Sequence, residues 1–560
     1  MVIYYLLFKL NVIDKDIFKM NKVMLVACPP TINYILDRSF LDLERLSQII
    51  IPPSLTIIGE RAFYKCISLE QIIFKEPSSL SSIGNSAFMG CKNLTEIAIP
   101  SSVTLIGESA FDECIKLASI SFGYPSSLMS IEKQLFAGCY ALKRLIIPSS
   151  VTIIKSLAFN KCKSLVRVYI PSSVIAIEEG AFCECPELTI VTNHSSITEI
   201  AENTFKYCYS LKETTIPSSV LLIKESAFEN CNSLKQISIP SSVIEIQKSA
   251  FSNCFNLTHV DIPSSVQKIE DNVFFNCKSL KKIVIPSLVT SIGNQSFCMC
   301  SSLVSVLFEN NSSSFKTIGD CAFESCLSLK EIPIPSSLTS IGDSAFYNCT
   351  LLSVFPIPSS VTSIGKNAFK RCLNLNKIPI PSIRVIRRQT FVDCSSLKEI
   401  SIPSTVRFID ENAFQGCSLV TKLSIPSSVV QIKPYAFSKM IFLTDVEIHA
   451  SLQCIEDHLF WKCETLKRVS IPSSVTIIRQ CAFKECFSLE EIKIPSSVAA
   501  IGPYSFSKCV SLKKIEIAPS LKLIGVFAFN KCMSLKQISV PSSLKISNIG
   551  LSPDAKVTRI

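Results

Sequence analysis

Residues 239–251 read IPSSVIEIQKSAF, and copies of this stretch recur along almost the whole chain. Each copy ends in a Phe that is usually preceded by Ala. The spacing between these landmark residues is 23, except for two steps of 25, one of 26 and one of 22. A fixed period of about 20 to 50 residues is typical of arrays built from one repeated structural unit. The landmarks are Phe63, Phe88, Phe111, Phe136, Phe159, Phe182, Phe205, Phe228, Phe251, Phe274, Phe297, Phe323, Phe346, Phe369, Phe391, Phe414, Phe437, Phe460, Phe483, Phe506 and Phe529.

Two groups of apolar positions follow each landmark. In one unit, Ile237 and Ile239 are separated by a single residue, which is the periodicity of a β-strand. Val243 and Ile246 form a shorter second group. The segment 248–254 shows no alternation and predicts a short helical turn.

One unit of this length cannot bury its own apolar face, but stacked units can. The pattern therefore predicts a solenoid of about 22 coils, with parallel ladders of short strands about 4.8 Å apart and a length of roughly 100 Å. Interior columns repeated in every coil also explain the hydrophobic content of 48% without a membrane.

The unit resembles the BspA-like leucine-rich repeat family, through the pattern IPSSVTxIGxxAFxxCxSLxxIxIP seen at residues 99–114 and 357–372. The resemblance covers residues 40–546. It implies an elongated, right-handed leucine-rich-repeat array and, as function, surface antigens or adhesins that meet host matrix proteins or other cells.

The array leaves little room for a separate domain. We expect residues 1–39 to form a degenerate N-terminal coil or cap, residues 40–546 the array, and residues 547–560 a short C-terminal tail. The start MVIYYLLFKL is a poor match to a signal peptide. Two interpretations stay open: the chain begins inside the array, or it is a fragment of a longer protein.

One region departs from the regular pattern. A polar insertion, ENNSSS, occupies residues 309–314, and Pro333, Pro356 and Pro379 then replace an outward strand residue in three consecutive coils. Proline lacks the N–H that a ladder residue donates. Either the array bends or its sheet loosens across residues 309–381, or the segment has drifted without structural consequence.

Twenty of the 26 cysteines occupy one repeat position, from Cys66 to Cys532, where Met440 is the only replacement. A position that accepts Met behaves as apolar core. Thiols stacked in parallel also have poor geometry for disulfides. The sequence predicts core thiols and indicates no metal site and no cofactor.

The formal charge of +11 is moderate for 560 residues. Lysine recurs seven residues after the landmark, so stacking would align it along one edge. Such an edge is either a solvated surface or a stripe for polyanions such as glycosaminoglycans or acidic proteins. No nucleic-acid-binding module is evident. The lysines are Lys143, Lys212, Lys235, Lys281, Lys330, Lys398, Lys467, Lys513 and Lys536.

The residues eight and ten after the landmark should point outward, and they vary freely between copies. Variable residues on a continuous sheet are how leucine-rich repeats bind proteins, although lack of packing constraint would give the same variation. No single residue is therefore named as a binding site. Examples at the tenth position are Ile73, Ala98, Ser121, Ile146, Tyr169 and Asp261; examples at the eighth are Arg144, Arg167, Glu213 and His259.

No catalytic constellation was found, so the sequence predicts a protein that is not an enzyme. No apolar run is long enough for a transmembrane helix. The main prediction is a non-enzymatic, protein-binding surface antigen or adhesin. The alternative is an intracellular protein-interaction scaffold, and a catalytic domain outside this sequence is a third, remote class. The family resemblance favours the cell surface, whereas the lack of a clear signal peptide or anchor keeps a cytoplasmic location open.

Overall fold

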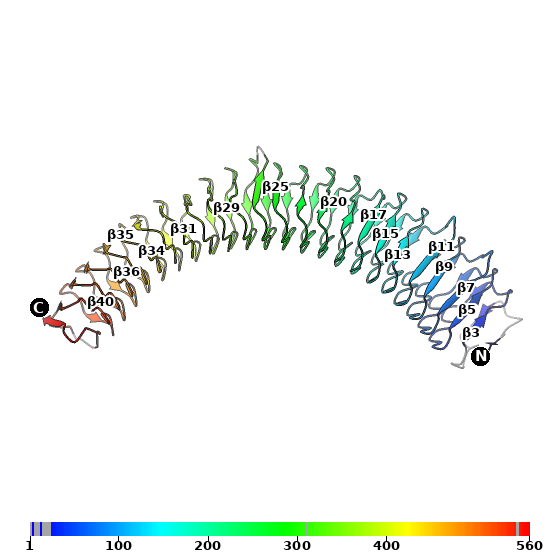
Figure 1. Cartoon of the computed structure of the whole chain (residues 1–560), viewed down its shortest axis with the longest axis horizontal. Coiled ribbons are helices and arrows are strands. Elements are labelled where there is room, and N and C mark those ends of the chain that lie inside the picture. Colours follow the sequence, from blue (N-terminus) through cyan, green and yellow to red (C-terminus); the bar gives the residue numbers. More distant parts are fainter. Residues whose placement is uncertain (1–2, 5–11, 14–23, 310–311, 545–547, 560) are drawn as a thin grey trace. The chain divides into compact units, whose positions relative to one another are not determined.

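The structure is a computed structural model, which describes residues 3–4, 12–13, 24–309, 312–544 and 548–559. The chain divides into two compact units, Met1–Leu280 (unit 1) and Lys281–Ile560 (unit 2), each of which is described by itself. The described residues form short β-strands joined by tight turns, and they contain no helix. Within each unit, consecutive coils lie side by side in sequence order (Figure 1).

Each regular coil carries a first strand, eight to eleven residues after the landmark Phe. In unit 1 the first strands are β1 (Ile3–Tyr4), β3 (Leu25–Ala27), β5 (Gln48–Ile51), β7 (Gln71–Phe74), β9 (Glu96–Ile99), β11 (Ser119–Phe122), β13 (Arg144–Ile146), β15 (Arg167–Ile170), β17 (Ile190–Asn193), β19 (Glu213–Thr214), β21 (Gln236–Ile237) and β23 (His259–Val260). In unit 2 they are β25 (Lys282–Ile285), β27 (Ser305–Phe308), β33 (Lys422–Ile425), β35 (Asp445–Ile448), β37 (Arg468–Val469), β39 (Glu491–Lys493), β41 (Lys514–Glu516), β43 (Gln537–Val540) and β44 (Lys556–Arg559).

A second, two-residue strand precedes each landmark Phe. In unit 1 these strands are β2 (Val12–Ile13), β4 (Tyr34–Ile35), β6 (Ile57–Ile58), β8 (Ser82–Ile83), β10 (Leu105–Ile106), β12 (Ser130–Ile131), β14 (Ile153–Ile154), β16 (Ala176–Ile177), β18 (Glu199–Ile200), β20 (Leu222–Ile223), β22 (Glu245–Ile246) and β24 (Lys268–Ile269). In unit 2 they are β26 (Ser291–Ile292), β28 (Thr317–Ile318), β29 (Ser340–Ile341), β30 (Ser363–Ile364), β31 (Val385–Ile386), β32 (Phe408–Ile409), β34 (Gln431–Ile432), β36 (Cys454–Ile455), β38 (Ile477–Ile478), β40 (Ala500–Ile501) and β42 (Leu523–Ile524).

Strands pair in parallel with the equivalent strand one coil away. In the first ladder Ile146 lies opposite Tyr169, and in the second Ile154 lies opposite Ile177. Equivalent residues therefore form columns, as parallel pairing in register requires. The predicted solenoid of stacked parallel strands is confirmed.

The core is a column of stacked phenylalanines. In unit 1 the rings of Phe228 and Phe251 have centroids 5.3 Å apart and an interplanar angle of 1°. In unit 2 the rings of Phe506 and Phe529 lie 5.6 Å apart at 7°. Such pairs contribute about 0.5 to 1.5 kcal/mol beyond the burial of their area. The repeated landmark is thus a continuous aromatic spine within each unit.

The repeated cysteine is buried beside this spine and forms a specific hydrogen bond. The Sγ of Cys231 lies 3.3 Å from the carbonyl oxygen of Phe205, one coil away. That oxygen also accepts the backbone N–H of Cys208 at 3.2 Å. A carbonyl oxygen has two lone pairs, and the thiol occupies the second one inside the core. The interpretation as core thiols is confirmed, with a donor role that the sequence did not predict.

The segment around each landmark Phe differs from the predicted helical turn. Ser249 and Asn253 have φ of 58° and 59°, in the left-handed region. The N–H groups of Ser249 and Phe251 donate to Asp271 and Val273 of the next coil at 3.0 and 2.9 Å. Donors aimed at the next coil cannot form the i to i−4 bonds of a helix. Tight turns with a third inter-coil ladder therefore replace the helical turn.

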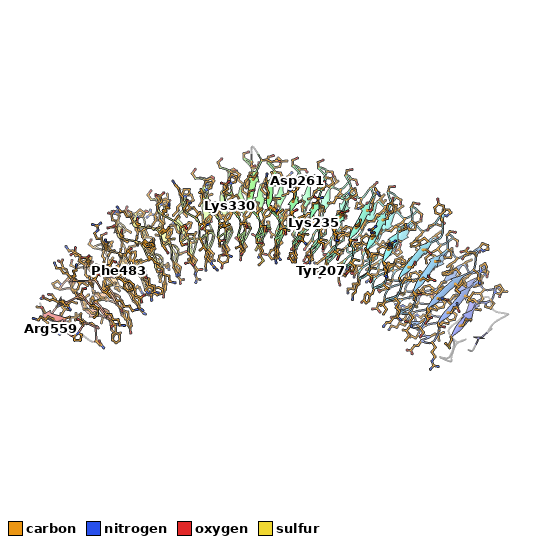
Figure 2. The ribbon with its side chains drawn as sticks, in the orientation of Figure 1. Tyr207, Lys235, Asp261, Lys330, Phe483 and Arg559 are labelled. Atoms are coloured by element: carbon orange, nitrogen blue, oxygen red, sulfur yellow. The ribbon has the colours of Figure 1, made fainter. Side chains whose placement is uncertain are left out.

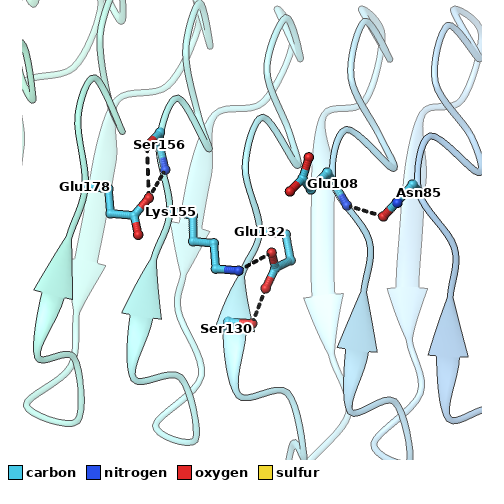
Figure 3. A network of polar contacts seen from close by, with 7 residues as sticks. All are labelled: Asn85, Glu108, Ser130, Glu132, Lys155, Ser156 and Glu178. Carbon is cyan, nitrogen blue, oxygen red and sulfur yellow. Dashed lines mark hydrogen bonds and ion pairs between the residues drawn. The ribbon is translucent and has the colours of Figure 1, made fainter.

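Close approach between coils explains the glycine four residues before many landmarks. A Cβ on Gly107 would lie 2.5 Å from the backbone nitrogen of Asn85 in the preceding coil. The Oδ1 of Asn85 accepts the N–H of Glu108 at 3.0 Å (Figure 3). The Asn side chain therefore bonds to the backbone of the next coil, and the Gly of that coil leaves room for the close approach.

Three consecutive coils replace that glycine with charged residues, and polar contacts take over. Lys155 Nζ lies 2.6 Å from Glu132 Oε2, and Ser130 donates to the same carboxylate (Figure 3). One coil further, the N–H and hydroxyl of Ser156 both donate to Glu178 Oε2 at 2.9 Å. This edge is therefore a structural network whose donors and acceptors satisfy one another.

Strand pairing extends into both terminal segments. Strand β3, before residue 40, pairs with β5, and β44 near the C-terminus pairs with β43. The boundaries at residues 39 and 547 stay predictions, and most of residues 1–23 lie outside the described part of the chain.

The coils with Pro333, Pro356 and Pro379 lack regular first strands. Three isolated bridges, between Ser305 and Glu331, Glu331 and Val354, and Val354 and Lys377, replace the ladder there. In a regular coil the tenth residue donates to its neighbour, as Ser470 N–H does to Val446 O at 3.2 Å. Proline cannot make this bond. The bend across 309–381 stays a prediction, and residues 310–311 of the insertion lie outside the described residues.

Candidate protein-binding face

The first strands present alternate side chains to solvent. In β15, Arg167 and Tyr169 are exposed, whereas Val168 and Ile170 are buried. The same alternation holds in β9 and β33. The outward positions eight and ten residues after the landmark are thus confirmed in regular coils. These side chains form the outer face of the first-strand sheet, which we call the outer face.

The lysines seven residues after the landmark lie at the edge of the outer face. The N–H of Val166 donates to Lys143 O, and the N–H of Thr258 donates to Lys235 O, both at 2.9 Å. This position is therefore aligned from coil to coil within each unit. All nine predicted lysines are exposed. Thr, Val, Ser, Asn and Glu interrupt the column, and Lys513 pairs with Glu490 of the neighbouring coil at 2.8 Å.

One part of the outer face combines basic and apolar side chains. Arg144 lies opposite Arg167, and Ile146 lies opposite Tyr169. Ile146 is 74% exposed and Tyr169 is 46% exposed. The ring of His194 lies 5.6 Å from that of Tyr169. We call these five residues the basic–apolar patch.

The electrostatics of the patch differ from those of the outer face near the C-terminus. Within the described residues, neither Arg144 nor Arg167 has a carboxylate within ion-pair distance. By contrast, Arg468 lies 2.6 Å from Asp445, and this hydrogen bond lowers the pKa of the Asp445 carboxyl. Lys514 pairs with Glu516 at 2.8 Å. The patch in unit 1 therefore carries unpaired positive charge, whereas the face near the C-terminus is largely self-neutralised.

Sequence reasoning placed Arg144, Ile146, Arg167 and Tyr169 outward but named none of them as a site. The structure brings these four together because parallel register superimposes equal positions of consecutive coils. The sequence did contain a signal for this patch. Two adjacent copies both have Arg at the eighth position and a large apolar residue at the tenth. His194 could not be predicted, because it lies outside the strand repeat.

Other site chemistries find little support in the structure. Among the described residues, no group of three or more His, Cys, Asp or Glu side chains is arranged to hold a metal ion. Burial raises the pKa of the Cys66 thiol to about 12, and the other repeat cysteines are likewise buried. None of the described segments forms a helix that could cross a bilayer.

Comparisons with known proteins agree with this architecture. The family described as BspA type leucine rich repeat region (6 copies) matches residues 11–124, 81–212, 198–317, 316–444 and 431–551. A search of the curated proteins found no match.

Solved structures of several bacterial proteins are similar. A leucine-rich repeat protein from Bacteroides ovatus is 26% identical, with 75% of this chain and 92% of that chain covered and a TM-score of 0.39. A leucine rich cell surface protein from Faecalibacterium prausnitzii is 30% identical, with 61% and 87% covered and a TM-score of 0.40. The pneumococcal vaccine antigen PcpA is 19% identical, with 61% and 89% covered and a TM-score of 0.36.

The fold and its outer face define a leucine-rich repeat solenoid, a class whose members generally bind proteins and typically act as non-enzymatic scaffolds. Within this class, the chain belongs to the BspA-type leucine-rich repeat family.

Proposed function

We propose that this chain is a surface antigen or adhesin whose basic–apolar patch binds host or matrix proteins. The observation that carries the proposal is the adjacent, exposed set of Arg144, Ile146, Arg167 and Tyr169. Arginine and tyrosine are enriched among the residues that dominate protein interfaces. The patch therefore fits a partner surface with an apolar side chain surrounded by carboxylates.

Energetics favour Ile146 and Tyr169 as anchors. Complete burial of a side chain such as Ile contributes roughly 1.5 to 3 kcal/mol. The ladder also fixes the strand backbone before binding, so little ordering entropy is lost on docking. The arginines add steering of an acidic partner and selectivity against basic surfaces.

Binding to decellularised epithelial matrix tests this proposal. Full-length chain is titrated onto the matrix and compared with the variant Arg144→Ala/Ile146→Ser/Arg167→Ala/Tyr169→Ser. The matched control, Gln236→Ala/Ser238→Ala/His259→Ala/Asp261→Ala, changes the same repeat positions in two other coils of unit 1. Asp261, one of the control positions, and Tyr207, which follows the landmark Phe205, lie at different margins of unit 1 (Figure 2).

We expect the patch variant to lose at least tenfold in affinity and the control to lose less than twofold. Equal losses in both variants, or unchanged binding by the patch variant, would contradict the patch as the docking site. Antibody staining of intact and permeabilised cells tests surface display separately. Staining only after permeabilisation would favour the intracellular interaction scaffold.

The lysine column supports a second candidate function, polyanion binding. Within each unit, the exposed lysines at this repeat position would follow the backbone of an acidic polymer. Each lysine that contacts the polymer makes its affinity more sensitive to salt. Replacing three such lysines would make the plot of log affinity against log salt less steep by roughly 2 to 3 units. We expect Lys143→Gln/Lys212→Gln/Lys235→Gln to elute from a heparin column at lower salt than the wild-type chain. Unchanged elution would exclude the column in unit 1 as the contact.

A further inference from the structure

The single 22-residue step lies between Phe369 and Phe391 and shortens one turn. The turn that follows the first-strand segment reads IPSI at residues 380–383, where the next coil has IPSTV at residues 402–406. In the shortened turn the N–H of Ile383 donates to Pro381 O at 2.7 Å, across two residues. The regular turn spans three residues between donor and acceptor. The deletion is therefore absorbed locally, by a tighter turn.

This tightening removes a hydrogen bond that neighbouring coils make. Ser360 Oγ donates to Leu338 O at 2.6 Å, and Thr405 Oγ1 donates to Ile383 O at 3.1 Å. Ser382, at the equivalent place between them, makes no such bond within the described part of unit 2. Ser382 lines a hollow of about 590 Å³ that is open to solvent. The hollow is lined by Ser382, Arg384, Thr405, Arg407, Phe408 and Val430.

Two arginines from consecutive coils line this hollow. The N–H of Arg407 donates to Arg384 O at 2.9 Å, so the two residues occupy equal positions one coil apart. Coils in a parallel ladder are separated by about 4.8 Å. Both side chains are exposed, and neither forms an ion pair within the described residues. Nearby Arg388, by contrast, lies 3.5 Å from Glu411.

We propose that the hollow beside the shortened turn binds a tetrahedral oxyanion, the chemistry of phosphate and sulfate, between Arg384 and Arg407. Guanidinium groups offer planar forks of N–H donors that match such oxygens. Two of them balance the charge of a dianion, and the Ser382 hydroxyl adds a neutral donor. Phe408 and Val430 provide an apolar wall for the carbon skeleton of an ester.

Three variants of the full chain separate this site from general basicity. Arg384→Gln/Arg407→Gln removes both charges. The matched control Arg38→Gln/Arg45→Gln removes two exposed arginines of unit 1 that lie outside both the hollow and the basic–apolar patch. A third variant inserts one Ser between Ser382 and Ile383, which restores the regular turn length and retains both arginines. Circular dichroism checks that each variant keeps its fold.

The measurement is equilibrium dialysis against labelled phosphate, sulfate and phenyl phosphate at pH 7.5, with constant ionic strength set by sodium chloride. We expect one anion per chain, and at least tenfold weaker binding in the double arginine variant and in the insertion variant. The control should change by less than twofold. Tighter binding of phenyl phosphate than of phosphate would support an ester as ligand, and equal binding would support a free ion.

Two results would overturn the proposal. One is an equal loss in Arg38→Gln/Arg45→Gln, because binding would then follow net charge rather than the hollow. The other is undiminished binding in the insertion variant, because the anion would then not depend on the shortened turn.

Discussion

The first-strand sheets of two regions differ in the residue ten positions after the landmark. In the coils of β13, β15 and β17, the tenth residue is Ile146, Tyr169 or Thr192, and the ladder is continuous. In the coils of Pro333, Pro356 and Pro379, the ladder shrinks to isolated bridges. Each of these prolines removes one backbone donor, and in these coils the outer face is not a regular platform. The basic–apolar patch lies on the regular region.

The proline coils also contain a packing change. Phe355 replaces the usual Ile or Val nine residues after the landmark, and it is fully buried. Its ring meets the rings of Phe346 and Phe369 edge-on, at centroid distances of 4.7 and 4.9 Å. Aromatic packing therefore offsets part of the hydrogen bonding that the prolines remove.

Truncation of Phe355 should give the largest effect. Phe355→Ala should cost about 3 to 5 kcal/mol, because it removes a buried ring and leaves a cavity. The control Val168→Ala, at the same repeat position in a regular coil, removes less volume and should cost clearly less. Urea titration with hydrogen-exchange mass spectrometry of each region measures both. Equal costs would contradict the special role of Phe355.

Introducing proline into the regular region should have the next largest effect. Tyr169→Pro removes the donor at the centre of β15, and we expect a loss of about 2 to 3 kcal/mol, mainly from the unmade bond and the buried unpaired carbonyl. Tyr169→Ser is the control for loss of the ring. The comparison fails if both variants have the same urea midpoint for unfolding of unit 1.

The rate of thiol labelling should differ by about tenfold between the two regions. Burial raises the pKa of the Cys162 and Cys349 thiols, so at pH 8 the reactive thiolate forms only after local opening. The rate should rise with pH, because deprotonation favours the reactive form. Iodoacetamide labelling read by mass spectrometry should be faster at Cys349, where the ladder is interrupted, than at Cys162. Faster labelling at Cys162 would contradict the comparison.

Restoring the donor in the proline region should have the smallest effect on stability. Pro356→Ser regains a ladder bond worth about 0.5 to 1.5 kcal/mol. It also gives the unfolded chain more freedom, which costs about 0.4 to 1 kcal/mol. The net change should lie within about 1 kcal/mol of zero, while amide protection at Val354 and Lys377 increases. Unchanged protection would show that other residues interrupt the ladder.

Much of the fold could be predicted because every coil must bury the same apolar positions against its neighbours. The columns of Phe228 and Cys231, the parallel ladders and the outward positions all follow from spacing and alternation. The turn around the landmark could not be predicted. Left-handed residues such as Ser249 cost about 1 to 2 kcal/mol each, and nothing in their identity reveals that inter-coil hydrogen bonds offset this cost.

The candidate site was only partly predictable. The sequence places Arg144 and Tyr169 outward, but adjacency across coils emerges only from the exact register. The sequence shows the 22-residue step near Ser382, but the hollow there was not predicted, because it depends on how the shortened turn closes. Local irregularities in a repeat therefore carry information that the consensus hides.

Native-state hydrogen exchange of the full-length chain tests the central claim most directly. The claim is that the outer face is a continuous ladder in β13, β15 and β17 and has only isolated bridges at Glu331, Val354 and Lys377. We predict protection at least about a hundredfold higher for the amides of Val168 and Tyr169 than for those of Val354 and Phe355. Equal protection in the two regions would contradict the account.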